Sequence, residues 1–193
     1  MKYSVLLAAM LLSFNAFAAE PLNYAKIDYT FRDTIAGQSD NPNRQGVNFT
    51  FGHKVSPNLV LDVNQQFRTE KLNSDDGSSS TRLETGLLYT APLNQTLFVY
   101  TRGALGYKFT SDDDSTYYSI EPGVKWKAFE NLSLKAGYRY RTAFNDSIFD
   151  KTNTVRVGAE FDLDKQQSLS LGVDRAYGDS EYLGLNAGYQ VKF

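Results

Sequence analysis

From Ala25 onward, apolar and polar residues alternate one by one along most of the chain. In the segment LKAGYRYR, residues 134–141, leucine, alanine and tyrosine occupy every second position, and lysine, glycine and arginine lie between them. Because successive side chains of a β-strand point to opposite faces, this alternation predicts a strand with one apolar face. The pattern recurs in ten segments, so the sequence predicts an all-β protein of ten strands, with twelve or eight strands as alternatives.

Two kinds of connection alternate between these segments. Short connections are found at 57–58, 93–95, 130–131 and 164–167. Longer connections, rich in acidic and polar residues, are found at 37–44, 74–80, 111–116, 145–153 and 178–181. Tight turns at one rim and longer polar loops at the other are typical of an antiparallel up-and-down barrel. Each segment is also long enough for a tilted strand that crosses a membrane, which needs about 9–11 residues.

The composition of the two faces favours a transmembrane barrel over a soluble one. The polar face carries many glycines, namely Gly52, Gly86, Gly106, Gly123, Gly137, Gly158, Gly172, Gly184 and Gly188. Glycines suit a crowded concave wall, where long neighbouring side chains need room. The apolar face carries rings near the strand ends, as the two aromatic girdles of a membrane barrel require. At the short-turn rim we expect Tyr24, Trp126, Phe129 and Phe193. Nearer the long loops we expect Phe31, Phe67, Tyr107, Tyr118, Tyr140 and Tyr177.

The first 18 residues differ from the rest of the chain. Lys2 is followed by an apolar run at 5–12 and by the small-residue motif AFA at 16–18. A cation, a short apolar core and an A-x-A motif are typical of a secretory signal peptide, and the apolar run is much shorter than the roughly 20 residues of a membrane-spanning helix. We therefore expect a cleaved signal peptide at 1–18 and a single barrel domain at 19–193.

Few residues offer catalytic or metal-binding chemistry. The chain has no cysteine, which excludes disulfides and thiolate metal sites, and it has a single histidine, His53. His53 falls on the apolar face shortly before the turn at Pro57, where it would lie at the level of the lipid headgroups. The acidic runs at 75–76 and 112–114 lie in predicted loops without a neighbouring base. We therefore predict no enzyme activity, no cofactor and no metal site.

The chain ends in NAGYQVKF, in which Tyr189, Val191 and the terminal Phe193 alternate to the last residue. This ending resembles the C-terminal insertion signal of bacterial outer-membrane β-barrel proteins. The resemblance implies residence in the outer membrane, insertion by the barrel-assembly machinery, and contact with outer-membrane lipid and lipopolysaccharide. It also implies that both termini and the short turns lie on the periplasmic side. A closed barrel agrees with this environment, because a sheet in lipid must satisfy its edges.

Charge is distributed unevenly between the loops and the polar face. The chain carries a formal net charge of −2, and acids concentrate in the predicted loops. By alternation, the inward cations are Lys26, Arg32, Lys54, Arg68, Arg82, Arg102, Lys108, Lys125, Lys127, Lys135, Arg139, Arg141, Arg156 and Lys192. The inward acids are Asp28, Asp62, Glu84, Glu121, Glu160, Asp162 and Asp174. An excess of positive charge in a confined lumen concentrates anions and repels cations.

Part of the inward face is therefore expected to contact anionic solutes. The expected contacts are Arg68, Arg82, Arg102, Lys108, Lys125, Arg139, Arg141 and Arg156. The expected counter-charges in the wall are Asp28, Glu121, Glu160 and Asp174. An alternative is that pairing inside the wall consumes the cations, with Arg139 bridging Glu121 and Glu160. Such pairing can occupy only about half of the cations, because the inward acids are half as many.

The basic segments LKAGYRYR and NTVRVGAEFDLD resemble strands of the monomeric porins for acidic oligosaccharides, the oligogalacturonate-specific family. The resemblance implies a passive channel that carries anionic sugars. That family has about twelve strands, whereas this sequence predicts ten. A barrel of about eight strands is filled by its own side chains, and porins of about 16–18 strands contain a water-filled channel. Ten strands lie just above the filled size, so we expect a narrow lumen here.

Two other functions remain open. A structural or adhesion barrel, similar to the small adhesion and serum-resistance proteins of the same membrane, would have a salt-bridged lumen and would act through its loops. An outer-membrane enzyme is the third alternative. Nucleic-acid binding is excluded, because the rings and the cations of segment 134–144 face opposite sides of a strand.

Overall fold

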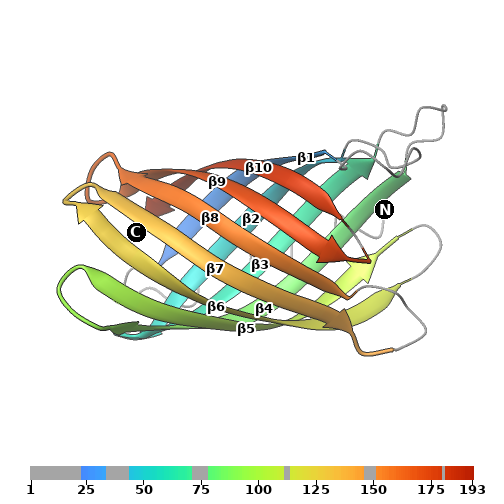
Figure 1. The fold of residues 1–193 in the computed structure, drawn as a ribbon, viewed down its shortest axis with the longest axis horizontal. Coiled ribbons are helices and arrows are strands. Elements are labelled where there is room, and N and C mark those ends of the chain that lie inside the picture. Colours follow the sequence, from blue (N-terminus) through green and yellow to red (C-terminus); the bar gives the residue numbers. More distant parts are fainter. Residues whose placement is uncertain (1–22, 34–43, 71–77, 111–113, 146–150, 180) are drawn as a thin grey trace.

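The computed structural model describes residues 23–33, 44–70, 78–110, 114–145, 151–179 and 181–193. These residues form ten antiparallel strands in a closed barrel, which confirms the predicted fold (Figure 1). The strands are β1 (Tyr24–Asp33), β2 (Arg44–Ser56), β3 (Leu59–Glu70), β4 (Ser78–Pro92), β5 (Leu97–Phe109), β6 (Ser115–Phe129), β7 (Leu132–Ala143), β8 (Thr152–Asp162), β9 (Gln167–Gly178) and β10 (Tyr182–Lys192). Each strand pairs with its neighbours in the chain, and the described residues include no helix long and apolar enough to cross a membrane.

The barrel closes where the first strand meets the last. β1 pairs with β10 in register from Tyr24↔Lys192 to Asp33↔Leu183. The backbones of Asn23 and Phe193 continue this pairing with two reciprocal N–H···O bonds of 2.9 and 2.8 Å. Closure gives every strand edge a partner, which a sheet surrounded by hydrocarbon requires.

Short turns occupy the rim at which β1 begins and β10 ends (Figure 1). Two of them are built in the same way: Asn94 Oδ1 accepts hydrogen bonds from the backbone N–H groups of Thr96 and Leu97, and Asp164 Oδ1 accepts from those of Gln166 and Gln167. These side-chain bonds replace strand pairing in the turn. We call this end of the barrel the turn rim and the opposite end the loop rim. The predicted long connections at the loop rim lie largely outside the described residues.

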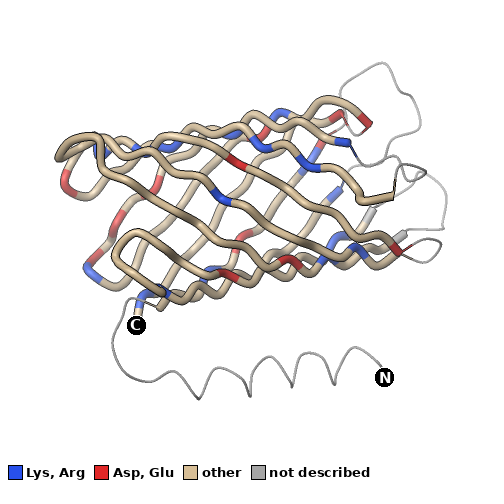
Figure 2. The backbone as a smooth tube through the Cα atoms, turned by 90° about the horizontal axis from the view of Figure 1, so that it is seen from below, with Lys and Arg blue, Asp and Glu red and all other residues tan. Residues whose placement is uncertain are grey.

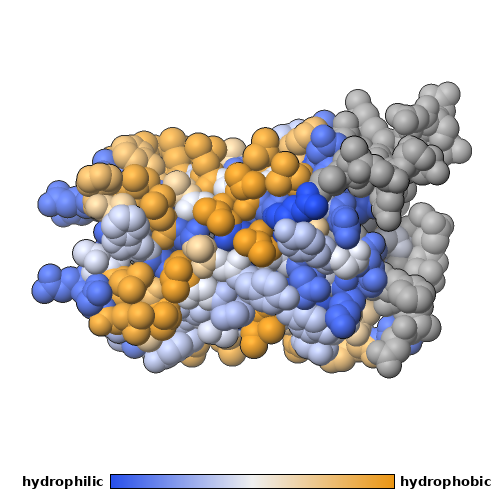
Figure 3. Space-filling view, viewed as in Figure 1, coloured by the Kyte–Doolittle hydropathy of each residue, from blue (hydrophilic) through white to orange (hydrophobic). Residues whose placement is uncertain are grey.

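The barrel is apolar outside and polar inside. Large apolar side chains such as Leu171, Val157 and Leu185 are more than half exposed on the outer face, and Figure 3 shows apolar side chains spread over it. The buried residues are mostly polar, among them Asp62, Arg82 and Glu84. A soluble barrel would bury its apolar face, so this arrangement is that of a barrel surrounded by lipid.

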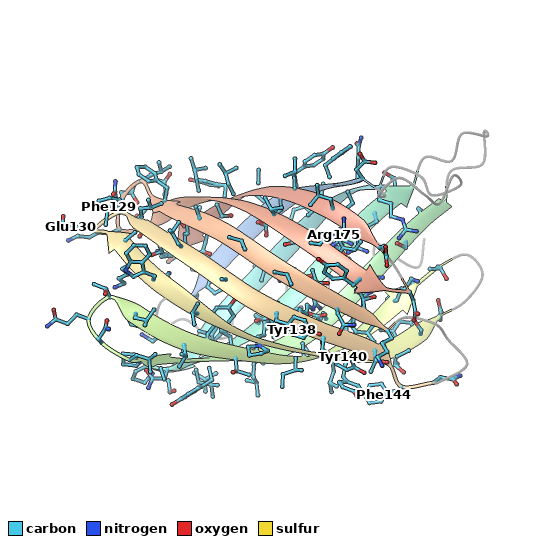
Figure 4. The ribbon with its side chains drawn as sticks, in the orientation of Figure 1. Phe129, Glu130, Tyr138, Tyr140, Phe144 and Arg175 are labelled. Atoms are coloured by element: carbon cyan, nitrogen blue, oxygen red, sulfur yellow. The ribbon has the colours of Figure 1, made fainter. Side chains whose placement is uncertain are left out.

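Aromatic rings lie towards both rims of the outer face. Figure 4 shows Phe129 at the turn rim and Tyr138, Tyr140 and Phe144 towards the loop rim. The Tyr118 ring contacts those of Tyr140 and Phe144, with centroids 6.3 and 5.3 Å apart. These clusters form the predicted girdles.

Tyr24 is not part of them. The prediction that placed it in the outer girdle is wrong, because its ring points into the lumen and lines the cavity there. Its position has the same parity as Lys26 and Asp28, which also line that cavity.

The inward glycines make room for large side chains on the next strand. Gly52 is the register partner of Tyr24, Gly106 of Tyr117, and Gly123 of Tyr100. In each pair, a Cβ atom on the glycine would collide with the ring opposite. The glycines therefore serve the crowded concave wall that the sequence indicated.

Candidate functional site

The lumen is the site where the charged side chains meet. It contains a cavity of about 270 Å³ whose lining runs from Tyr24 at the turn rim to Arg32 and Tyr182 at the loop rim. Figure 2 shows both basic and acidic positions along the barrel wall. The cavity is slightly smaller than most small-molecule sites, which measure about 300–1,000 Å³.

The first ion-paired group at mid-height joins four strands. Arg102 on β5 binds Asp62 on β3 through two N–H groups, with N···O distances of 2.9 and 2.5 Å, and it binds Glu84 on β4 at 2.5 Å. Arg139 on β7 binds the other oxygen of Glu84 at 2.5 Å and Ser119 at 3.2 Å. Glu84 is therefore shared by two guanidinium groups. The two-point contact of Arg102 with Asp62 is the geometry in which arginine holds a carboxylate most firmly.

The second ion-paired group lies on the β6–β10 side of the lumen. Arg156 on β8 donates to Glu121 on β6 at 2.8 Å and to Asp174 on β9 at 3.3 Å. Tyr100 donates to the other oxygen of Glu121 at 3.4 Å, and Asn186 donates to Asp174 at 3.4 Å. The neutral side chains of Tyr100 and Asn186 thus supply hydrogen bonds that the two carboxylates can accept in addition to those from Arg156.

These partners differ from those that the sequence suggested for Arg139. Bridging of Glu121 and Glu160 by Arg139 is wrong, since Arg139 pairs with Glu84 instead. Glu121 pairs with Arg156, and Glu160 pairs with Lys135 and Lys125. The sequence places neighbours on adjacent strands, but a long side chain in a curved wall also reaches strands across the lumen.

Nearer the turn rim, the inward carboxylates pair with lysines instead of arginines. Glu160 on β8 accepts a hydrogen bond from Nζ of Lys135, and its other carboxylate oxygen lies 3.6 Å from Nζ of Lys125. Lys26 pairs with Asp28 at 2.7 Å, and Lys192 pairs with Asp162 at 3.2 Å. Each of the inward acids named above is therefore ion-paired. The cations that pair with them are Lys26, Arg102, Lys125, Lys135, Arg139, Arg156 and Lys192.

At the loop rim the lumen is lined by four arginines and two tyrosines, a group that we call the upper arginine cluster. It consists of Arg32, Arg68, Arg82, Arg141, Tyr117 and Tyr182, all of which line the cavity. The guanidinium of Arg32 lies 4.1 Å from the ring centroid of Tyr182. Those of Arg82 and Arg141 lie 6.0 and 5.5 Å from the ring of Tyr117. Arg141 also donates to Thr152 at 3.3 Å.

The structure divides the predicted anion contacts into two sets. Arg102, Lys125, Arg139 and Arg156 are engaged by carboxylates of the wall. Arg68, Arg82 and Arg141 lie in the upper arginine cluster, and Lys108 lies beside it as the register partner of Arg82. The predicted counter-charges Asp28, Glu121, Glu160 and Asp174 all lie in the lumen wall.

The sequence interpretation missed the tyrosines of the upper arginine cluster. Tyr117 precedes the outward Tyr118 by one residue, so alternation alone assigns it to the inner face. Tyr182 likewise precedes the outward Leu183.

Two further predicted features lie outside the lumen. His53 Nδ1 lies 2.7 Å from Asn23 Oδ1 near the turn rim. In the predicted insertion signal, the rings of Tyr189 and Phe193 are exposed on the outside, and Tyr189 donates to Gln167 at 2.6 Å.

The fold is shared with solved outer-membrane barrels. An outer-membrane channel of Pseudomonas putida F1 aligns over 92% of this chain and 98% of its own, with 12% identity and a TM-score of 0.62. The β domain of the Bordetella autotransporter BrkA aligns over 89% of this chain and 99% of its own, with 11% identity and a TM-score of 0.61. At such identities the likeness shows the fold alone.

A third solved structure, the KdgM porin in complex with oligogalacturonate, aligns over 89% of this chain and 98% of its own, with 12% identity and a TM-score of 0.49. No curated protein matches the chain. The profile of the outer membrane protein β-barrel domain family matches residues 4–193, which is nearly the whole sequence. The chain therefore belongs to the outer membrane protein β-barrel domain family.

Proposed function

We propose that this barrel is a narrow passive channel of the outer membrane that prefers small anionic solutes, such as single acidic sugars. The observation that carries the proposal is the charge balance of the lumen. The inward acids are all bound by wall cations, whereas Arg32, Lys54, Arg68 and Lys127 form no ion pair with a carboxylate of the described residues. The wall therefore keeps an excess of positive charge, which favours anions in a confined space.

The dimensions of the lumen set the size of the solute. The cavity of about 270 Å³ is lined by residues from both ends of the strands. A cavity of this volume is large enough for an inorganic anion or a single acidic sugar, so we infer that these are the preferred solutes. The proposed channel differs in this respect from the oligogalacturonate porins that its basic strands resemble.

One observation supports a second function, that of a non-conducting structural or adhesion barrel. Arg139 on β7 and Glu84 on β4 bind each other across three strand intervals, and Arg156 on β8 and Glu121 on β6 bind across two. These contacts join strands of the wall that are not neighbours in the sheet. If they leave no path for hydrated ions, the barrel is closed and acts through its loops.

Single-channel recording in planar bilayers under a salt gradient distinguishes the two functions. We expect discrete conductance steps and a reversal potential that indicates anion preference. Conductance no higher than that of protein-free bilayers would refute the channel and favour the closed barrel. A reversal potential that indicates cation preference would refute the anion preference while keeping the channel. The folded state of each preparation is checked by the change in gel mobility on boiling.

A further inference from the structure

Two arginines of the upper arginine cluster, Arg32 and Arg68, carry positive charge that no carboxylate of the described residues pairs with. The four arginines of the cluster are at most 9% exposed, and all of them line the same cavity. Arg32 and Arg68 form no ion pair with a carboxylate among the described residues, and Arg32 Nε makes no hydrogen bond there. Burying a charge without a partner is costly. An anion bound between these side chains would remove that cost.

Three guanidinium groups of the cluster lie over the faces of tyrosine rings. Arg32 stacks on Tyr182, and Arg82 and Arg141 flank the ring of Tyr117, which is only 2% exposed. A cation over an aromatic face is stabilised by the ring, but its N–H groups, which lie in the guanidinium plane, are not used. Stacking therefore fixes the orientation of Arg32 and leaves its donor edge available. A planar fork of this kind binds two oxygens of a phosphate or carboxylate at once.

Small residues leave space beside the arginines. Gly46 is the register partner of Arg68, and Gly184 is the register partner of Arg32. A Cβ atom on Gly46 would lie 3.1 Å from Cγ of Arg68 and 2.8 Å from the backbone oxygen of Phe67, so no larger residue fits there without displacement. The arginine stems thus pack against glycine, and their charged ends reach the cavity.

From these observations we infer that the upper arginine cluster is a binding site for an oxyanion, namely the phosphate or carboxylate group of a small polar solute. Arg32 and Arg68 supply the uncompensated charge and the donors, and Tyr182 orients Arg32. The inference rests on the proposed function for the route by which the solute arrives, because the site lies in the lumen of the proposed channel. Binding itself does not require conduction, so the two can be tested separately.

Isothermal titration calorimetry on the folded barrel in detergent micelles at low ionic strength tests the site. The probes are inorganic phosphate, galacturonate and, as a neutral control, galactose. We expect one or both anions to bind and galactose not to bind; the anion that binds identifies the group. The double variant Arg32→Gln/Arg68→Gln is expected to weaken binding about tenfold or more, because charge-assisted hydrogen bonds are lost.

Lys127→Gln is the matched control. It removes one positive charge, as each substitution of the double variant does, but from the inner face near the turn rim, where Lys127 lies 5.2 Å from the centroid of the Phe98 ring. We expect less than about a twofold change in affinity, since the site itself is intact. Equal weakening by Lys127→Gln and by the double variant would overturn the inference, because it would show only a general effect of lumen charge. Absence of binding by the unaltered barrel, or unchanged affinity in the double variant, would also overturn it.

A conservative variant guards against misfolding. Arg68→Lys keeps the charge but loses the planar fork, so it should fold like the parent and bind the anion several-fold more weakly. Affinity equal to that of the parent would overturn the role of Arg68. Conductance recorded on the same preparations separates this inference from the proposed function. Binding without conductance would support the site and refute the channel. Anion-selective conductance without binding would support the channel and refute the site.

Discussion

Arg139 on β7 donates a hydrogen bond to Glu84 on β4, at an N···O distance of 2.5 Å and across 55 residues of sequence. The contact joins strands that are not neighbours in the sheet, and Glu84 also holds Arg102 on β5. A single carboxylate therefore ties together two arginines in the middle of the lumen. It balances part of the positive charge of the two arginines.

Glu84→Gln is expected to destabilise the barrel and to increase its anion conductance. The substitution removes a counter-charge from two partly buried guanidinium groups, which costs about 1–3 kcal/mol for unsatisfied polar partners. Urea titration in detergent measures the loss of stability, and bilayer recording measures the conductance. Ser119→Ala is the control, because it removes another hydrogen-bond partner of Arg139 without a change of charge. Conductance that falls below that of the parent would contradict the prediction.

Adding Arg139→Gln to Glu84→Gln should restore part of the lost stability, since one of the two arginines no longer lacks its partner. A double-mutant cycle in the same urea titration measures the coupling between the two residues. Strictly additive losses would show that the contact contributes nothing to stability.

Arg139→Glu combined with Arg141→Glu is expected to reduce or invert the preference for anions. Both side chains line the lumen, so each reversal changes the charge that a passing ion meets. The reversal potential under a salt gradient measures this effect. Arg175→Glu reverses one charge at an outward position, next to Tyr177 on β9, and should leave the selectivity unchanged (Figure 4). A similar shift in both variants would argue against selectivity by the lumen wall.

Gly106→Ala is expected to destabilise the barrel, whereas Gly103→Ala is expected to be tolerated. A Cβ atom at Gly106 would collide with the buried ring of Tyr117, while a Cβ atom at Gly103 would meet no atom within 4 Å. Overpacking of this kind costs about 1–3 kcal/mol. The temperature at which gel mobility changes compares the two variants. Equal temperatures would show that the Tyr117 ring moves aside at little cost.

Phe193→Ser is expected to slow assembly into the outer membrane more than it alters the finished barrel. The ring of Phe193 is 65% exposed, and its contacts with Asn23 are made by the backbone. Pulse-chase fractionation measures the rate of insertion, and Lys192→Ser serves as a control at the neighbouring inward position. An unchanged rate in the Phe193 variant would refute the proposed role of the terminal ring.

Removal of residues 1–18 is a separate expectation, because the apolar run and the AFA motif predict cleavage after Ala18. Mass spectrometry of the protein extracted from outer membranes should give a chain that begins at Ala19. A chain that retains Lys2 would contradict the predicted cleavage.

The alternation of residue types predicted ten strands as the first choice, short turns at one rim, and the inner face for the charged residues that line the cavity. These properties are local, since the two-residue period of a strand is set by its own backbone. Tyr24 shows that the position of a residue in the two-residue period predicts its face better than the residue type does. Its ring suggested a girdle, but its position in the period placed it in the lumen opposite Gly52.

The partners of the inward charges were decided by the tertiary structure alone. Alternation predicts that Arg139, Glu84 and Glu121 all face inward, but it does not say which of the two acids Arg139 binds. That choice depends on the curvature of the closed wall and on the stagger of its strands, which bring β7 and β4 within reach of one another. The separation of the lumen into an ion-paired middle and the upper arginine cluster follows from the same geometry. Sequence thus determined which residues line the lumen, and closure of the barrel determined which of them meet.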